Sequence, residues 1–136
     1  MSKDQTREYK AVKTITFANL AAAADLFTVT GSVMVKIVGI CTTLVASAAA
    51  GNVEVGVASD PDAIIATTLA TDIDADEFWH DASPDSDIEA LSTMREYMIC
   101  GGADIILTPD AQIDTGAIIF ICLWRPLEGG SSVVAA

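Results

Sequence analysis

Short apolar runs separated by turn residues extend along most of the chain. The most apolar of them, GAIIFICLWRPL at 116–127, is uninterrupted from Ile118 to Trp124 and ends at an Arg-Pro pair. It is too short to cross a bilayer, which takes about 20 apolar residues. Its β-branched and aromatic content predicts a strand buried on both faces. Such a strand needs a sheet around it and a second layer over it.

Other segments repeat this pattern with clearer alternation. Val53, Val55 and Val57 share one face of a half-exposed strand, and Lys36 is the lone charge in a run that points Met34 to the same side. Gly31-Ser32, between two β-rich runs, predicts a hairpin. Together with the run above, seven to nine short strands are expected, including those at 14–17, 26–30, 33–40, 52–58, 63–69, 78–79, 96–100 and 103–108.

This spacing of strands and turns, without alternating βαβ units, predicts an all-β chain, an antiparallel β-sandwich or jelly-roll-like single domain. We expect an N-terminal arm at 1–13, the sandwich domain at 14–128 and a small, flexible C-terminal tail at 129–136. Residues 85–99 leave two alternatives open, a short capped helix or a loop leading into a strand, and the loop is preferred.

Composition adds a reason to expect self-association. The chain of 136 residues is 51% apolar but only 19% charged and 6% aromatic. A single small core leaves part of such an apolar surface uncovered, and association with further copies is the usual remedy.

Charge is unevenly distributed and excludes a nucleic-acid surface, which needs a cationic footprint. The net charge is -12, and no Lys or Arg occurs between positions 36 and 95. The basic residues gather instead at the N-terminus, where they form either a solvated segment or an arm that docks on an acidic partner. The candidates for that contact are Lys3, Arg7, Tyr9, Lys10 and Lys13.

Cysteine usage and hydropathy place the chain among soluble, intracellularly made proteins. Cys41, Cys100 and Cys122 are odd in number and lack a CxxC spacing, which favours free, mostly buried thiols. We find no signal peptide, and the charge-free run at 37–53 is interrupted by Gly, Ser and Thr, so it is a poor membrane span.

An acidic cluster is the one candidate for a cation. Asp72, Asp74 and Asp76 alternate, and carboxylate oxygens are the ligands that Ca²⁺ takes. An EF-hand fails, because Glu77 stands where that loop needs Gly and Ser83 where it needs Glu. A solvated acidic edge that deters strand pairing is the preferred interpretation, with a different calcium site as the alternative. No cofactor is expected.

No residue pattern predicts an enzyme. His80 is the only histidine, and no GxSxG elbow, P-loop or GxGxxG accompanies it. The cysteines lie in or next to apolar runs, where a thiol behaves as a small apolar side chain. Trp79 and Trp124 are interpreted as core or subunit-interface anchors rather than as a ligand box.

Three stretches of the sequence resemble a known type of protein. FWHDASPDSDIEALST at 78–93, YMICGGADIILT at 97–108 and the ICLWRPL ending at 121–127 resemble small proteins encoded in structural-gene regions of tailed phages and prophages. The resemblance spans most of residues 26–127. It implies a virion component, a capsid decoration (cement) protein made in the host cytoplasm and set on the capsid surface as a homotrimer. Its partners would be the major capsid protein and copies of itself.

Two alternatives stand beside this hypothesis. One is a head-fibre or tail-associated virion protein. The other is a small ligand- or carbohydrate-binding β-sandwich, which a monomeric state in solution would favour.

Overall fold

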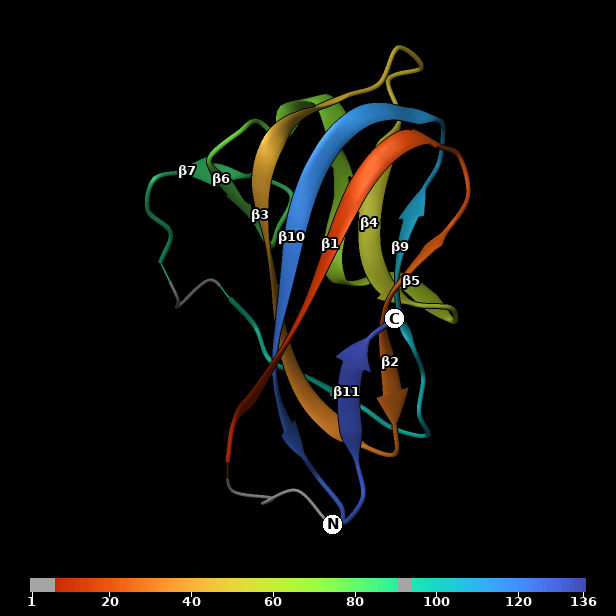
Figure 1. The fold of residues 1–136 in the computed structure, drawn as a ribbon, viewed down its shortest axis with the longest axis vertical. Helices are drawn as coiled ribbons and strands as arrows, with labels where there is room; N and C mark the ends of the chain where they lie inside the picture. The colour runs from red at the N-terminus through yellow and green to blue at the C-terminus, as the bar shows by residue number, and fades with distance from the viewer. Residues whose placement is uncertain (1–6, 91–93) are drawn as a thin grey trace.

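The computed structural model describes residues 7–90 and 94–136, which form two facing β-sheets (Figure 1). Strands dominate these residues, and a single 3-10 turn, η1 (Ala70–Asp72), accompanies them. The strands are β1 (Tyr9–Leu20), β2 (Ala24–Thr30), β3 (Val33–Ala46), β4 (Asn52–Val57), β5 (Asp60–Leu69), β6 (Glu77–Trp79), β7 (Asp85–Ser86), β8 (Tyr97–Ile99), β9 (Ile105–Pro109), β10 (Ile113–Pro126) and β11 (Ser132–Ala135).

Strand order identifies the type of sandwich. Sheet A runs β1-β10-β3-β6-β7, with β8 also pairing with β3, and sheet B runs β11-β2-β9-β4-β5. All of these pairs are antiparallel. The chain passes repeatedly from one sheet to the other, so that β1-β10-β3-β6 faces β2-β9-β4-β5. This is the double Greek-key order of a jelly roll. The predicted fold class is confirmed.

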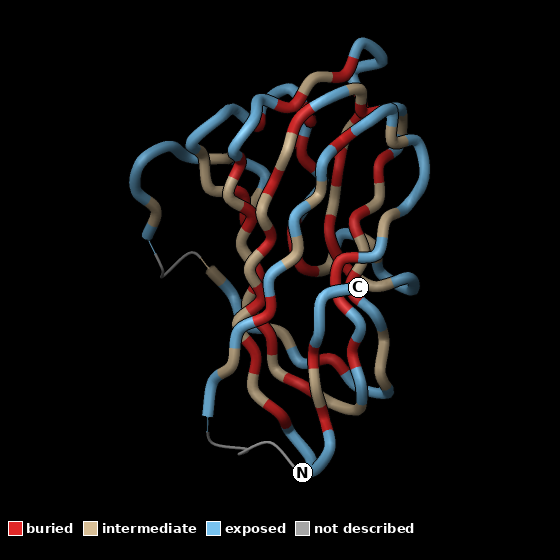
Figure 2. Tube along the Cα trace, in the orientation of Figure 1, coloured by how far each residue is buried: buried red, intermediate tan, exposed pale blue. Residues whose placement is uncertain are grey.

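The core lies between the inner faces of the two sheets, where the alternate residues of each strand are buried (Figure 2). The edge of the Trp79 ring meets the Phe120 ring with 5.9 Å between centroids. Gly39 pairs with both residues across the sheet. A Cβ on Gly39 would lie 2.8 Å from Ile118 and 3.3 Å from the Phe120 ring, so the missing side chain makes room for them.

The predicted hairpin at Gly31-Ser32 is wrong. β2 belongs to sheet B and β3 to sheet A, so the two strands face each other across the core and do not pair. The connection is held by long-range contacts: the Ser32 amide donates to Glu128 Oε1 at 3.0 Å, and the Gly102 amide donates to the Gly31 carbonyl at 3.0 Å. A turn signal is local, and it does not distinguish a hairpin from a crossing between sheets.

Part of the predicted arm, residues 9–13, and part of the predicted tail, residues 132–135, lie in strands. β1 begins at Tyr9, within the expected arm, because residues 9–13 pair with β10 and Ala11 packs in the core. The expected tail contains β11, which pairs with β2 and buries Val133. The contacts that order these segments come from residues far away in the sequence.

The final apolar strand is buried on one face only. β10 buries Ile118, Phe120, Cys122 and Trp124, whereas the side chains between them are half-buried on the outside of sheet A. The sequence predicts burial of this outer side as well, but the described residues form no further sheet over it.

The segment at 85–99 follows the preferred alternative in part. Its described residues contain β7 and β8 and no helix, whereas residues 91–93 lie outside the described part. Across residues 7–90 and 94–136, no helix has the length and apolar character needed to span a bilayer.

Candidate functional site: the outer face of sheet A

The outer face of sheet A is apolar at its centre. The register aligns Val12, Ile121 and Val38 in one row across β1, β10 and β3, and a parallel row joins Ile119 to Ile40. An antiparallel sheet that faces water normally alternates apolar and polar residues, and this one does not. The apolar side chains of the face are Val12, Met34, Val38, Ile40, Phe78, Met98, Ile119, Ile121 and Leu123.

None of these side chains is fully buried in the single chain. Val12 is 43% exposed and Met98 76% exposed, and the others are half-buried. Covering such side chains contributes about 25 cal/mol per Å² of apolar surface removed from water. Contiguous apolar surface of this kind marks an interaction site more often than scattered exposed residues do.

The rim of this face is polar and carries most of its charge at one end. Lys10, Leu123 and Lys36 form one cross-strand row, and Arg125 follows on β10. Lys36 Nζ lies 3.8 Å from a Glu8 oxygen, and Arg125 donates to Glu96 at 2.7 Å. An apolar centre with a polar rim is the organisation of a protein–protein interface.

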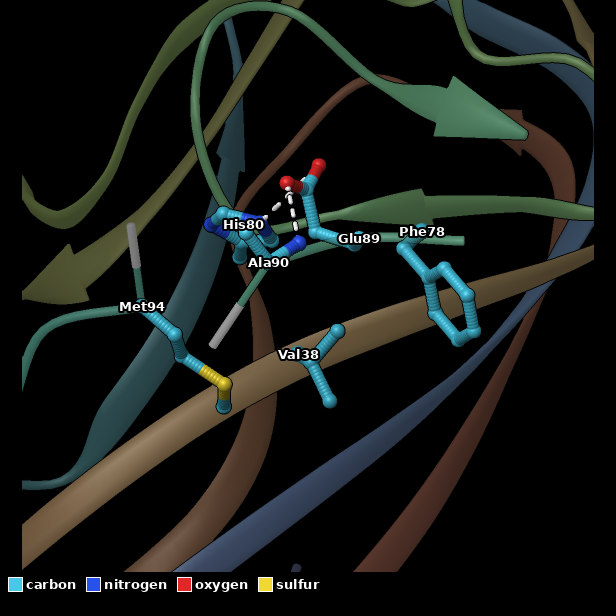
Figure 3. A pocket seen from close by; sticks show the side chains of 6 residues that line it. All are labelled: Val38, Phe78, His80, Glu89, Ala90 and Met94. Carbon is cyan, nitrogen blue, oxygen red and sulfur yellow. Dashed lines mark hydrogen bonds and ion pairs between the residues drawn. The ribbon is translucent and has the colours of Figure 1, made fainter. Parts of the chain in front are cut away.

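A cavity of about 130 Å³ opens beside this face, next to β3 and β6 (Figure 3). His80 Nε2 lies 3.3 Å from Glu89 Oε2, and both side chains are largely buried. A hydrogen bond shared with Asp85 lowers the pKa of Glu89 and raises that of Asp85. These contacts hold the chain after β7 against sheet A. The cavity is lined by Val38, Phe78, His80, Glu89, Ala90 and Met94.

The basic residues predicted to bind a partner have different surroundings. Arg7 lies over the Tyr9 ring, 5.4 Å from its centroid, and Tyr9 stacks on Trp124 at 4.9 Å. Lys13 Nζ donates to the Ala136 carbonyl at 2.6 Å, so it joins β1 to the end of sheet B. Lys10 is exposed on the outer face. Lys3 lies outside the described residues.

The two tryptophans are buried in the core. Trp79 is inaccessible to solvent, and Trp124 is 4% exposed. Their rings contact Phe120 and Tyr9 of the same chain, and this accounts for their packing within one subunit.

The acidic cluster does not converge. The Asp76 amide donates to the Cys41 carbonyl at 2.9 Å, and Glu77 accepts from the Asp74 amide at 2.6 Å. Among residues 7–90 and 94–136, no three His, Cys, Asp or Glu side chains are grouped so as to hold a metal ion. Asp72, Asp74 and Asp76 point their carboxylates into solvent around a turn.

The two buried thiols, those of Cys41 and Cys122, are expected to be unreactive. Burial raises the pKa of Cys122 to about 12. Burial also raises the pKa of Cys41 to about 11, although a backbone hydrogen bond from Thr43 to the sulfur opposes the rise. Because the thiolate is the nucleophile, both groups are inert at neutral pH, whereas Cys100 is exposed.

The outer face itself was missed as a site by inspection of the sequence. Its signal was present, since Ile119, Ile121 and Leu123 occupy positions where a solvent-facing strand carries polar residues. That signal was interpreted as burial by a second layer of the same chain.

Comparison with known proteins gives one structural match of note. No protein-family model matches the chain, and no curated protein matches its sequence. The fold is similar to that of a chain in the acidic stable capsid structure of Helicobacter pylori bacteriophage KHP30, with a TM-score of 0.53 and 12% sequence identity. The match covers 97% of this chain and 98% of that chain. The likeness therefore concerns the whole fold, from one end to the other.

Proposed function

We propose that this chain is a structural protein of a phage virion, a capsid decoration (cement) protein that binds the major capsid protein as a homotrimer. The observation that carries the proposal is the end-to-end likeness to a chain of a phage capsid structure, which leaves almost no part of either chain unmatched. A fold alone does not establish a function, so the surface must supply the rest.

The outer face of sheet A supports this role. A protein that holds a shell together needs a rigid body and broad contact surfaces rather than a reaction centre. In the described residues the two-sheet core supplies the rigid body, and the apolar outer face with its charged rim supplies a contact surface. Lys10, one of the residues predicted to bind a partner, is exposed at that rim.

A non-enzymatic role is part of the proposal. Two of the three thiols are buried with raised pKa values, and the ring nitrogens of His80 lie 3.3 Å from Glu89 Oε2 and 3.8 Å from Asp81 Oδ2. This chemistry favours a structural function for the polar groups around His80.

The test uses undecorated capsids assembled from the major capsid protein of the phage that encodes the chain. Purified protein should co-sediment with them until a fixed number of symmetry-related sites is filled, and cryo-electron microscopy should place it on the shell. A purified protein that leaves capsids bare would refute the proposal. Density at the tail or on fibres would replace it with the alternative virion location.

The role of the N-terminal residues needs two variants. Deleting residues 1–6 removes Lys3 and leaves β1 intact, whereas Lys10→Glu reverses one charge on the outer face. Reduced capsid occupancy with the deletion alone would assign capsid binding to residues 1–6. Reduced capsid occupancy with Lys10→Glu alone would assign capsid binding to the rim of the outer face of sheet A.

One observation favours a second candidate, a small-ligand or carbohydrate-binding module. A groove of about 610 Å³ lies on the other side of His80 and includes polar groups of Asp81, Arg95 and Tyr97. Its size is within the range of ligand sites. A glycan array read alongside the capsid assay separates the two functions, because binding to a glycan without binding to capsids would favour the module.

A further inference from the structure

The chain carries an element that is chemically complementary to its own outer face. Ile88 follows β7 and is 82% exposed, although it is a large apolar side chain. Acidic residues surround it in the sequence, with Asp85 and Asp87 before it and Glu89 after it. We name residues 85–89 the acidic tip.

The acidic tip is fixed in place on both sides of Ile88. The Ile88 amide donates to the Ser86 carbonyl at 2.7 Å, and Asp87 adopts a left-handed backbone with φ of 66°. Glu89 lies 3.3 Å from His80, as described above. A side chain presented from a fixed backbone loses little conformational freedom on binding, which favours its use as an anchor.

Charge distinguishes the tip from the outer face. Ten acids and no Lys or Arg lie between positions 60 and 89, so the tip belongs to the most acidic part of the chain. The outer face carries Lys10, Lys36 and Arg125; Lys36 pairs with Glu8 and Arg125 with Glu96 of the same chain, whereas Lys10 is exposed. Two outer faces placed against each other would bring lysines together, whereas a tip against a face pairs opposite charges.

The acidic tip lies beside β6 and β7, at the far end of sheet A from β1. β1 and β7 are the ends of the strand order, and the tip extends beyond β7 on the β3 side (Figure 1). Val12 on β1 is therefore far along the sheet from Ile88 of the same chain. A tip that projects from one side of a subunit can meet the β1–β10 side of the next one.

We infer that the outer face of sheet A is covered on its β1–β10 side by a second copy of this chain, whose Ile88 packs on the paired side chains of Val12 and Ile121. The exposed Asp87 carboxylate of the tip then lies against the exposed Lys10 at the rim. The contact joins two different surfaces, so it is heterologous, and copies arranged by a rotation that closes form a ring. This inference rests on the proposed function, because it specifies the contact within the homotrimer proposed there.

Single substitutions test each half of the contact. Light scattering should give the wild type a mass of three times the 14.2 kDa of one chain. Ile88→Asp and Val12→Asp should each give monomers, with self-association weakened by at least about tenfold, because each removes an apolar anchor and adds a repulsive or unpaired charge. Val134→Asp is the matched control, since Val134 is also 54% exposed but lies on β11 in sheet B.

Mixing the two variants tests the heterologous geometry. Ile88→Asp retains an intact face and Val12→Asp retains an intact tip, so an equimolar mixture should form a dimer with one good contact. A trimer that survives Ile88→Asp, or two monomeric variants that stay monomeric when mixed, would overturn the inference. Circular dichroism and thermal melting of each variant ensure that the subunits are folded.

A capsid-binding assay distinguishes a failure of this inference from a failure of the proposed function. A monomeric wild type that still occupies capsids would refute the tip-to-face contact but would not refute the proposed decoration function. A trimer that dissociates as expected but never binds capsids would refute decoration and support the contact.

Discussion

The indole nitrogen of Trp79 in sheet A donates a 2.9 Å hydrogen bond to the hydroxyl of Thr68 in sheet B, and both side chains are buried. The Thr68 hydroxyl donates in turn to the Ala66 carbonyl at 2.8 Å. A polar group thus connects the two layers inside an otherwise apolar core. Because a buried donor without an acceptor is costly, this contact is a sensitive point of the fold.

Thr68→Val should lower the free energy of unfolding by about 1–3 kcal/mol, because it leaves the Trp79 N–H buried without an acceptor. Urea denaturation measures the change. Thr108→Val is the matched control, since the Thr108 hydroxyl is buried with no hydrogen-bond partner among the described residues. This control should be neutral or stabilising, and an equal loss in both variants would contradict the role of the Thr68 contact.

Thiol reactivity should distinguish the three cysteines. At pH 7.5 a thiol reagent such as Ellman's should modify Cys100 of the folded protein rapidly and leave Cys41 and Cys122 unmodified. The buried pair is protected by inaccessibility and by pKa values raised to about 11 and 12. All three should react in guanidinium, and Cys100→Ser should remove the rapid phase. Three equally reactive thiols in the folded state would contradict the core placement.

Asp110 should make stability depend on pH in the acid range. Hydrogen bonds from the Asn52 side chain, at 2.8 Å, and from the Asn52 amide, at 2.7 Å, lower the pKa of Asp110 below its ordinary value of 3.8. The stabilisation is therefore present above the pKa of the unfolded chain and is lost as the pH falls through the lower folded pKa.

Asp110→Asn should accordingly lower the melting temperature at pH 7, and the difference from wild type should shrink as the pH falls below 3.8. Melting curves across this range provide the measurement. Thr28→Asn, at an exposed position of β2, changes no titratable group; it is the control and should leave the pH dependence of the melting temperature as in wild type. A difference that widens toward low pH would reverse the predicted sign.

Two glycines should differ in their tolerance of a methyl group. A Cβ on Gly56 would lie 2.2 Å from the Asp60 carbonyl oxygen, which is backbone, whereas on Gly39 it would meet the end of the Ile118 side chain at 2.8 Å. Gly39→Ala should cost about 1–3 kcal/mol of unfolding free energy, and Gly56→Ala should cost more, because the β4–β5 pairing must shift. Equal losses in denaturant titrations would contradict this order.

Inspection of the sequence predicted most strands but not their partners. The valines of β4 and the apolar row of β10 are local patterns, so they could be recognised within a few residues. The assignment of β2 and β3 to different sheets depends on β9 and β10, which lie much later in the chain. For the same reason the ordered start of β1 was missed, since Tyr9 owes its position to stacking on Trp124.

The candidate site was predictable only in part. Lys10 was singled out by charge and lies on the outer face, but Lys13 is engaged by the Ala136 carbonyl of its own chain. Burial of β10 on both faces was expected, and the exposure of Ile121 on the outside of sheet A departs from it. Whether the cover of an apolar strand comes from its own chain or from another one is not encoded in its pattern of side chains.

The register of sheet A also governs how the protein must be made. Among the described residues, β1 pairs within its sheet only with β10, with Tyr9 opposite Trp124 and Leu20 opposite Ile113. During synthesis the first strand therefore leaves the ribosome long before the residues that pair with it. The pairing of β1 is completed only after β10 has emerged, and pairing across such sequence distances is slow compared with the folding of helical domains.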